Sequence, residues 1–391
     1  MPVSEPAAAA FRSRQARAAE WMARAGVYAA VLEDFEHQRS SMVRWLSGHP
    51  MDALLFLFAT GESVLVPWDV NIARERAVVG EIVPYTEFRR SFKEAVLTVL
   101  KSHGAEAAVS GPRGRRRVEL PERTTHLRLQ ELTADLPGAR LLVRPDGLEF
   151  FLSRARVVKD AVEIAAVEKA ADITNQLIEL VSTRVREARG REPLREIDLA
   201  QLVEREALAR GGEGLGFETL AAGPARSWAI HPFPACSGGP FGTEGLSILD
   251  FGIRVDGYTS DVTLTFAVGR LSATQEKMIG LVEAAYEAGA EAVRPQVSPG
   301  EPARRVNQIF TEAGWVMPHS LGHGIGLDAH EGPLLRGQGD GPDPLFLPGM
   351  VATLEPGLYD PREGGVRWEN DVLVTESGSR ILTRSRVERI P

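Results

Sequence analysis

Residues 246–268 read LSILDFGIRVDGYTSDVTLTFAV, with two apolar runs on either side of Asp256-Gly257. An Asp-Gly pair between two such runs is a strong local signal for a β-hairpin. The predicted strands are 246–251 and 258–268. Each run carries one carboxylate, Asp250 in the first and Asp261 in the second. Because an unpaired carboxylate is expensive to bury, both side chains are expected to face a cation.

Two further carboxylates interrupt apolar runs nearer the C-terminus. Glu355 ends the run at 351–354, and Glu369 lies inside a predicted strand at 366–375. At ~4 Å and an effective dielectric constant near 20, each like-charged pair would cost about 4 kcal/mol. Two divalent cations would balance the four charges of such a cluster, and His323 offers a neutral nitrogen ligand. The sequence therefore predicts a dinuclear metal site.

The expected ligands are mostly oxygen with one imidazole. This set suits Mn²⁺ or Co²⁺ best, and Zn²⁺ and Fe²⁺ are also compatible with it. Glycines at 322, 324 and 326 surround His323 and argue against a helix there. His319 and His323 therefore do not form the helical pair of mononuclear zinc peptidases. Paired divalent ions of this kind are typical of hydrolases.

The order of predicted elements indicates two domains with an α+β fold. Apolar runs at 54–58 and 63–66 predict a hairpin within an N-terminal α/β unit, which extends to about Val157. Strands and helices of the second half interleave without a regular βαβ rhythm, which favours α+β over a doubly wound sheet. The expected domains are 1–157 and 158–391.

Composition excludes several other classes of protein. The chain has 391 residues and a net charge of −8, which argues against nucleic-acid binding. The arginines at 113, 115, 116 and 117 are interpreted as a solvated loop, because acidic residues follow at once. The most apolar stretch, 53–58, is too short to span a membrane. A single cysteine, Cys236, suits a reducing compartment, and we expect a cytoplasmic protein.

Four segments together resemble the pita-bread metallopeptidase family M24, and more narrowly its aminopeptidase P and prolidase branch. The segments run from Leu249 to Asp261, from His319 to Glu331, from Leu354 to Gly357 and from Val366 to Asn370. The resemblance implies a creatinase-like N-terminal domain before a pita-bread catalytic domain. It also implies a homodimer that acts on small peptides with proline at the second position.

The resemblance assigns a role to each expected metal ligand. Asp250 would bind one metal, and His323 and Glu355 would bind the other. Asp261 and Glu369 would bridge the two. Glu355 would also assist deprotonation of the attacking water.

Four further residues match outer positions of the family's site. His231 would assist proton movement, and His330 would hydrogen-bond the substrate near the scissile bond. His319 would line the proline side of the pocket. Arg367 would meet the substrate or order His330.

Two positions depart from the family pattern, and several activities are compatible with it. Leu264 stands where an arginine is usual, and Asn370 stands where an aspartate often follows the last ligand. Because neighbours of metal ligands tune metal affinity, both departures are expected to affect metal preference and rate. The leading hypothesis is an Xaa-Pro aminopeptidase or dipeptidase. The alternatives are a creatinase-like or ectoine-hydrolase-like enzyme acting on another C–N bond, and a noncatalytic binding module.

Overall fold

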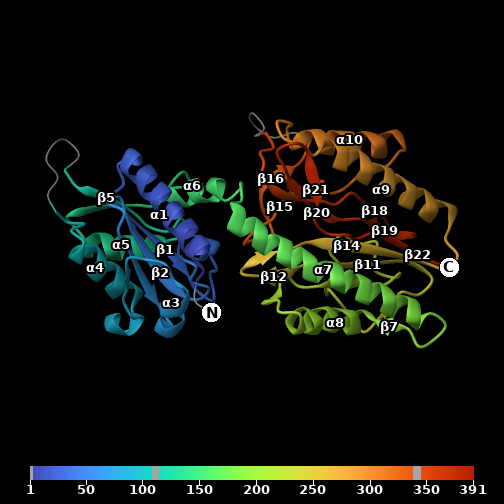
Figure 1. The fold of residues 1–391 in the computed structure, drawn as a ribbon, viewed down its shortest axis with the longest axis horizontal. Helices are drawn as coiled ribbons and strands as arrows, with labels where there is room; N and C mark the ends of the chain where they lie inside the picture. The colour runs from blue at the N-terminus through green and yellow to red at the C-terminus, as the bar shows by residue number, and fades with distance from the viewer. Residues whose placement is uncertain (1–2, 108–113, 338–344) are drawn as a thin grey trace. The chain divides into compact units, whose positions relative to one another are not determined.

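A computed structural model describes residues 3–107, 114–337 and 345–391, and it divides the chain into two units, Met1–Arg156 and Val157–Pro391 (Figure 1). Each unit mixes helices and sheet, as the α+β prediction requires. No helix within the described ranges is long and apolar enough to cross a membrane.

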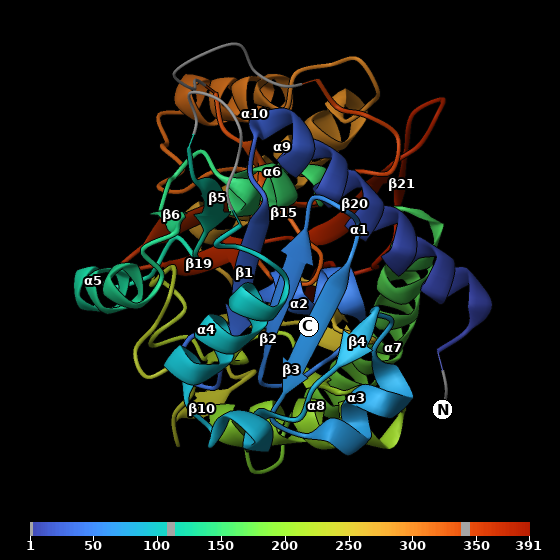
Figure 2. The same cartoon turned by 90° about the vertical axis from the view of Figure 1, so that its left-hand side faces the viewer.

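The first unit is built on one six-stranded sheet with the order β4-β3-β2-β1-β5-β6. Figure 2 shows β1, β2 and β3 lying side by side. Its strands are β1 (Ala29–Asp34), β2 (Ala53–Phe58), β3 (Ser63–Pro67), β4 (Glu81–Ile82), β5 (Arg116–Glu119) and β6 (Ala139–Leu142). Its helices are α1 (Glu5–Ala25), α2 (Ser41–Ser47), α3 (Val70–Arg76), the 3₁₀ turn η1 (Tyr85–Phe88), α4 (Phe92–Ser102), α5 (His126–Asp135) and α6 (Leu148–Ala155). The predicted hairpin is confirmed, since β2 pairs antiparallel with β3.

The arginine cluster of this unit is only partly the loop that was predicted. Arg113 lies outside the described residues, and Arg115 is exposed. Arg116 and Arg117 instead lie in β5, half-buried, and each donates a hydrogen bond to a backbone carbonyl. The loop prediction was wrong for these two residues because they pair with the sheet despite their charge.

The second unit contains two sheets whose inner faces turn toward each other. One has the order β22-β14-β11-β9 and the other β16-β15-β17-β20-β21. The first comprises β9 (Leu220–Ala222), β11 (Gly245–Phe251), β14 (Val262–Val268) and β22 (Val387–Ile390). The second comprises β15 (Gly322–Gly324), β16 (Glu331–Leu335), β17 (Val351–Leu354), β20 (Asn370–Val374) and β21 (Ser379–Ile381). Short strands complete the unit: β7 (Leu194–Arg195), β8 (Gly214–Leu215), β10 (Pro240–Phe241), β12 (Ile253–Val255), β13 (Tyr258–Thr259), β18 (Gly357–Asp360) and β19 (Gly364–Arg367).

Two pairs of helices cover the outer faces of these sheets (Figure 1). Leu249 and Leu264 pack with α7 (Ala161–Ala188) and α8 (Glu196–Ala209) in one apolar cluster. Leu354 packs with α9 (Ala273–Ala292) and α10 (Gly300–Glu312) in another. Because side chains alternate along a strand, the residues next to these leucines point inward. The polar inner layer therefore lies between two apolar layers.

The Asp256-Gly257 turn exists, but it joins shorter strands than predicted. Both residues have positive φ, 50° and 89°, and they connect β12 to β13. The predicted second arm is interrupted, so that Asp261 lies between β13 and β14. Pairing of β11 with β14 places Asp250 opposite Thr263.

The strand predicted at 366–375 is also divided. It separates into β19 and β20, which belong to different sheets, and Trp368 and Glu369 connect them. The N–H of Glu369 donates to the carbonyl of Thr263 at 3.2 Å, which ties β20 to the opposite sheet. Apolar residues continue through the break, so the sequence pattern predicted a single strand. The break depends on the long-range hydrogen bond from Glu369 to Thr263.

Candidate metal centre

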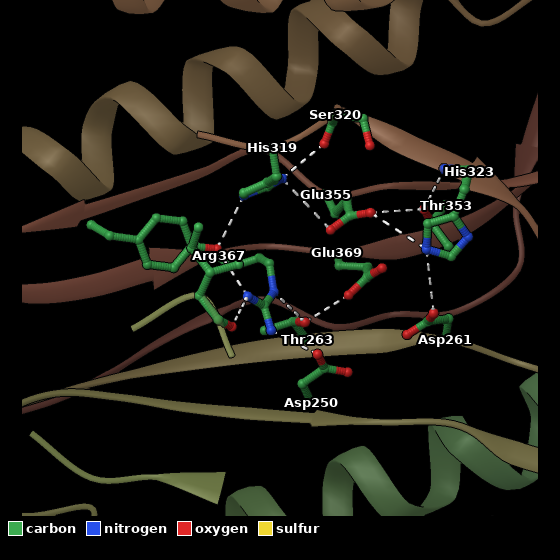
Figure 3. Close-up of polar contacts among 12 residues, drawn as sticks. Asp250, Asp261, Thr263, His319, Ser320, His323, Thr353, Glu355, Arg367 and Glu369 are labelled. Atoms are coloured by element: carbon green, nitrogen blue, oxygen red, sulfur yellow. Dashed lines mark hydrogen bonds and ion pairs between the residues drawn. The ribbon is translucent and has the colours of Figure 1, made fainter. Parts of the chain in front are cut away.

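Three of the five predicted metal ligands gather into one cluster between the sheets. Asp261, His323 and Glu369 are all buried, and each offers a ligand atom within 4.8 Å of the others. Figure 3 shows Glu355 and Glu369 between Arg367 and His323. Glu355 joins the cluster through His323, whose Nε2 lies 3.6 Å from Glu355 Oε1.

Neighbouring polar groups fix each member of the cluster. The N–H of Asp261 donates to Asp371 Oδ2 at 3.1 Å, and the N–H of His323 donates to Thr353 Oγ1 at 3.1 Å. Glu369 Oε2 accepts a bond of 2.6 Å from Thr263 Oγ1. These contacts come from both sheets, so the cluster requires both to be in place.

The His323 ring presents its Nε2 to the carboxylates. Its Nδ1 lies 3.2 Å from the Gly324 carbonyl, an acceptor, so Nδ1 carries the proton in the neutral ring. Nε2 then presents a lone pair, 3.8 Å from Asp261 Oδ2. That separation is too long for a hydrogen bond. A cation between the two atoms would satisfy both.

The carboxyl groups are strongly perturbed by burial and by one another. Burial raises the pKa of Asp261 and Glu369 well above the usual range, and neighbouring carboxylates add to the rise. Burial raises the pKa of Glu355 to about 7. Burial also lowers the pKa of His323 to about 4, so the imidazole is neutral at pH 7. Carboxyl groups that resist ionisation without a nearby positive charge, beside a neutral nitrogen, are a good fit for divalent metal ions.

Asp250, the fifth predicted ligand, is held by an arginine. Arg367 Nη2 donates to Asp250 Oδ2 at 2.6 Å. Asp250 Oδ1 is buried and has no hydrogen-bond partner within the described ranges. Burial raises the pKa of Asp250, although the charges of Arg367, His231 and His330 oppose the rise. The unpartnered oxygen fits a metal ligand as the resemblance implied.

Arg367 contacts several protein groups besides Asp250. Its Nε donates to Thr263 Oγ1 at 2.9 Å, and its Nη1 donates to Tyr359 Oη at 2.9 Å and to the Ile230 carbonyl at 3.2 Å. His330 instead stacks on His323, with ring centroids 4.0 Å apart. Arg367 therefore orders Asp250, Tyr359 and the chain at Ile230.

His319 lies on the Arg367 side of the site (Figure 3). Its Nδ1 lies 2.8 Å from the Ser320 carbonyl and its Nε2 lies 3.2 Å from Tyr359 Oη. Burial lowers the pKa of His319 to about 4 and raises the pKa of Tyr359 to about 12. The Tyr359 hydroxyl therefore donates to a neutral imidazole.

Several residues at the site were not predicted from the sequence. Tyr359, Thr263, Thr353 and Asp371 all bond to predicted site residues. Hydroxyl side chains are common in strands, and nothing in the spacing of Tyr359 and Thr353 distinguishes them. Two of the four had a usable signal: Asp371 is a carboxylate within the apolar run 366–375, and Thr263 lies two residues beyond Asp261.

The two departures from the family pattern point away from the site. Leu264 is fully buried in the apolar cluster against α7 and α8. Asn370 Nδ2 donates to Tyr286 Oη at 3.0 Å and to the Ser385 carbonyl at 3.3 Å. Its Oδ1 accepts from the Ser385 N–H at 2.7 Å. An amide, and not a carboxylate, matches these partners, since the carbonyl requires a donor.

Acidic side chains and one imidazole, buried between two helix-covered sheets, form a site that could hold divalent metal ions. The sequence profile of Metallopeptidase family M24 matches residues 165–376, and that of the Creatinase/Prolidase N-terminal domain matches residues 14–143. The chain therefore belongs to metallopeptidase family M24 and combines a creatinase-type N-terminal domain with a pita-bread catalytic domain.

Individual proteins agree with this assignment. The chain is 30% identical over 389 residues to YkvY of Bacillus subtilis (strain 168), covering 95% of this chain and 98% of that one. It is 33% identical over 235 residues to the Xaa-Pro dipeptidase of Pyrococcus furiosus, covering 60% of this chain and 65% of that one. The solved structure of an Xaa-Pro dipeptidase from Bacillus anthracis has the same fold, with a TM-score of 0.81, 24% identity and coverage of 97% and 99%.

Proposed function

We propose that the protein hydrolyses the peptide bond between a first residue and a following proline. The observation that carries this proposal is the convergence of Asp261, His323 and Glu369 on one buried point. The similarity to an Xaa-Pro dipeptidase supports the choice of substrate.

Five residues would hold two divalent metal ions, as the resemblance assigns them. The unpartnered Asp250 Oδ1 and the inward Nε2 of His323 support these assignments. We propose Mn²⁺ as the native metal because the ligands are mostly carboxylate oxygens. When bound, such ions polarise the scissile carbonyl and make water more acidic.

Glu355 is proposed as the general base. In the metal-free protein burial raises the pKa of Glu355 to about 7, and its Oε1 lies 3.6 Å from His323 Nε2 within the cluster. Glu355 would take a proton from the attacking water and return it to the leaving proline nitrogen. The bond from Thr353 Oγ1 to Glu355 Oε1, 3.4 Å, holds one oxygen toward His323.

The three outer histidines are proposed to handle the substrate. His330 is exposed and stacks on His323, so it can reach a bound peptide. His319 is neutral and is proposed to line the proline side. His231 is proposed to move a proton, and Arg367 is proposed to order Asp250 because its guanidinium is occupied by protein groups.

A metal-replacement assay tests the function. Removing metal with a chelator should abolish release of alanine from Ala-Pro, and adding Mn²⁺ or Co²⁺ should restore it. Ala-Gly is the matched control and should be cleaved poorly. Activity that survives the chelator, or equal cleavage of both dipeptides, would contradict the proposal.

Cleavage of Ala-Pro-Ala as well as Ala-Pro would identify an aminopeptidase, whereas cleavage of Ala-Pro alone would identify a dipeptidase.

The homodimer and the cytoplasmic location stay predictions. Sedimentation of the purified protein would test the first, and cell fractionation would test the second.

A further inference from the structure

The chain from Gly223 to Gly239, here called the His231 loop, borders the candidate metal centre. The Ile230 carbonyl accepts from Arg367 Nη1 at 3.2 Å, and Ser227 Oγ accepts from the Gly365 N–H at 3.2 Å. His231 follows directly on the first of these contacts. The conformation of this loop therefore determines where the His231 ring lies.

Large apolar side chains do not hold the loop in place. Phe233 is 98% exposed and Trp228 is 44% exposed, so neither is packed in a core. Pro232 is buried and Cys236 packs against the apolar cluster of α7 and α8, and polar contacts hold much of the rest of the loop.

Several polar contacts of the loop meet at Glu196, the first residue of α8. Its side chain is 1% exposed, although it carries a carboxylate. Oε1 accepts from the Gly223 N–H at 2.8 Å, and Oε2 accepts from Ser237 Oγ at 2.6 Å and from Arg226 Nη1. One buried carboxylate thus binds the beginning and the end of the loop.

Arg226 extends this connection to the middle of the loop. Its second terminal nitrogen, Nη2, donates to the Pro234 carbonyl, three residues beyond His231. A planar guanidinium can serve two acceptors in a fixed geometry, which a lysine ammonium does not reproduce. The Glu196–Arg226 pair therefore spans the segment that contains His231.

The backbone is fitted closely around the carboxylate. A Cβ at Gly223 would lie 1.9 Å from the Pro240 carbonyl oxygen, so only glycine fits there. The N–H of Glu196 itself donates to the Gly239 carbonyl at 3.0 Å. A buried ion pair is a weak source of stability, and its better-attested use is to specify one geometry.

We propose that Glu196 is a positioning residue for the hydrolytic reaction, acting through Arg226 and the His231 loop. The kinetic part of this inference rests on the proposed function. The structural part does not, because it concerns the loop alone.

Glu196→Gln tests the proposal, because it keeps the shape of the side chain and removes the charge that holds Arg226. Glu206→Gln is the matched control, since Glu206 pairs with Arg210 on the same helix but away from the loop. Hydrogen exchange of the metal-loaded protein should be about tenfold faster at residues 224–235 in the Glu196 variant. Exchange in β11 and β14 should be unchanged, and the control should match wild type. Unchanged exchange at 224–235 would overturn the proposal.

A double-mutant cycle separates positioning from general destabilisation. Glu196→Gln should lower kcat for Ala-Pro about tenfold or more, with metal content and KM near wild type. In a His231→Ala background the same substitution should have almost no further effect on kcat. Full additivity of the two effects would overturn action through His231. If wild type does not cleave Ala-Pro, the proposed function fails, and the exchange experiment still decides the role of Glu196.

Discussion

Arg367 and Asp250 form a buried pair at the edge of the candidate metal centre, with Nη2 and Oδ2 2.6 Å apart. The side chains are only 3% and 13% exposed, so the pair is removed from water. Asp250 Oδ1 has no hydrogen-bond partner among the described residues, while Arg367 also bonds Thr263, Tyr359 and the Ile230 carbonyl. The Arg367 side chain therefore links a proposed ligand to Tyr359 in β18 and to the His231 loop.

Arg367→Lys should preserve the positive charge but lose most of the hydrogen bonds that the guanidinium donates. A lysine ammonium can reach one of these acceptors at a time, so we expect Mn²⁺ affinity and kcat to fall about tenfold or more. Arg367→Met should lower the free energy of unfolding by about 3–5 kcal/mol, because it leaves Asp250 buried without its partner. Calorimetric metal titration and denaturant unfolding measure the two effects. Near-normal metal affinity in the lysine variant would contradict this role.

Glu355→Gln should remove the proposed general base and leave the fold intact. We expect kcat to fall by about 10²–10⁴, with a circular dichroism spectrum like that of wild type. Glu363→Gln is a suitable control, because Glu363 accepts a bond from Ser272 on the surface of the same unit. Substantial turnover by the Glu355 variant would exclude the assignment.

Metal-free protein should lose stability as the pH rises. The pKa of Glu355 is raised by burial from 4.5 to about 7, and burial also raises the pKa of Asp261 and Glu369 well above their usual range. These carboxyl groups bind more protons in the folded than in the unfolded state, so they lower the unfolding free energy as the pH rises. His319 and His323, whose pKa is lowered to about 4, oppose this trend only below about pH 6.5. Thermal unfolding after chelation should therefore give a higher Tm near pH 6.5 than near pH 8, and added Mn²⁺ should raise Tm more at the higher pH. The opposite order of Tm values would refute this account.

The convergence of Asp261, His323 and Glu369 was predictable from the sequence because of the residue types. Carboxylates inside apolar runs are costly to bury, and this cost indicates a shared cation wherever the runs meet. This cost of burial does not depend on the exact strand bounds. Asp261 joins the cluster although it lies beside a strand and not within one.

The partners of these groups were not predictable in the same way. Tyr359 and Thr353 carry hydroxyls that bond equally well to water, so their sequence context contains no energetic signal. The break at Trp368 was also hidden, because local apolarity continues through it and only the bond to the opposite sheet reveals it. Long-range hydrogen bonds thus account for most of what the pattern missed.

Asn370→Asp should destabilise the protein, although an aspartate often occupies this position in the family. In the wild type, Asn370 Nδ2 donates to the Ser385 carbonyl at 3.3 Å. An aspartate would place a carboxylate oxygen, which is an acceptor, against this carbonyl. It would also replace a hydrogen-bonded amide with a buried charge. We expect the free energy of unfolding to fall by about 1–3 kcal/mol, with little change in Mn²⁺ affinity, because the side chain points away from the ligands. Asn307→Asp on the exposed face of α10 controls for the added charge and should change the unfolding free energy by less than about 0.5 kcal/mol. An Asn370 variant as stable as wild type would show that the partners of this amide can rearrange.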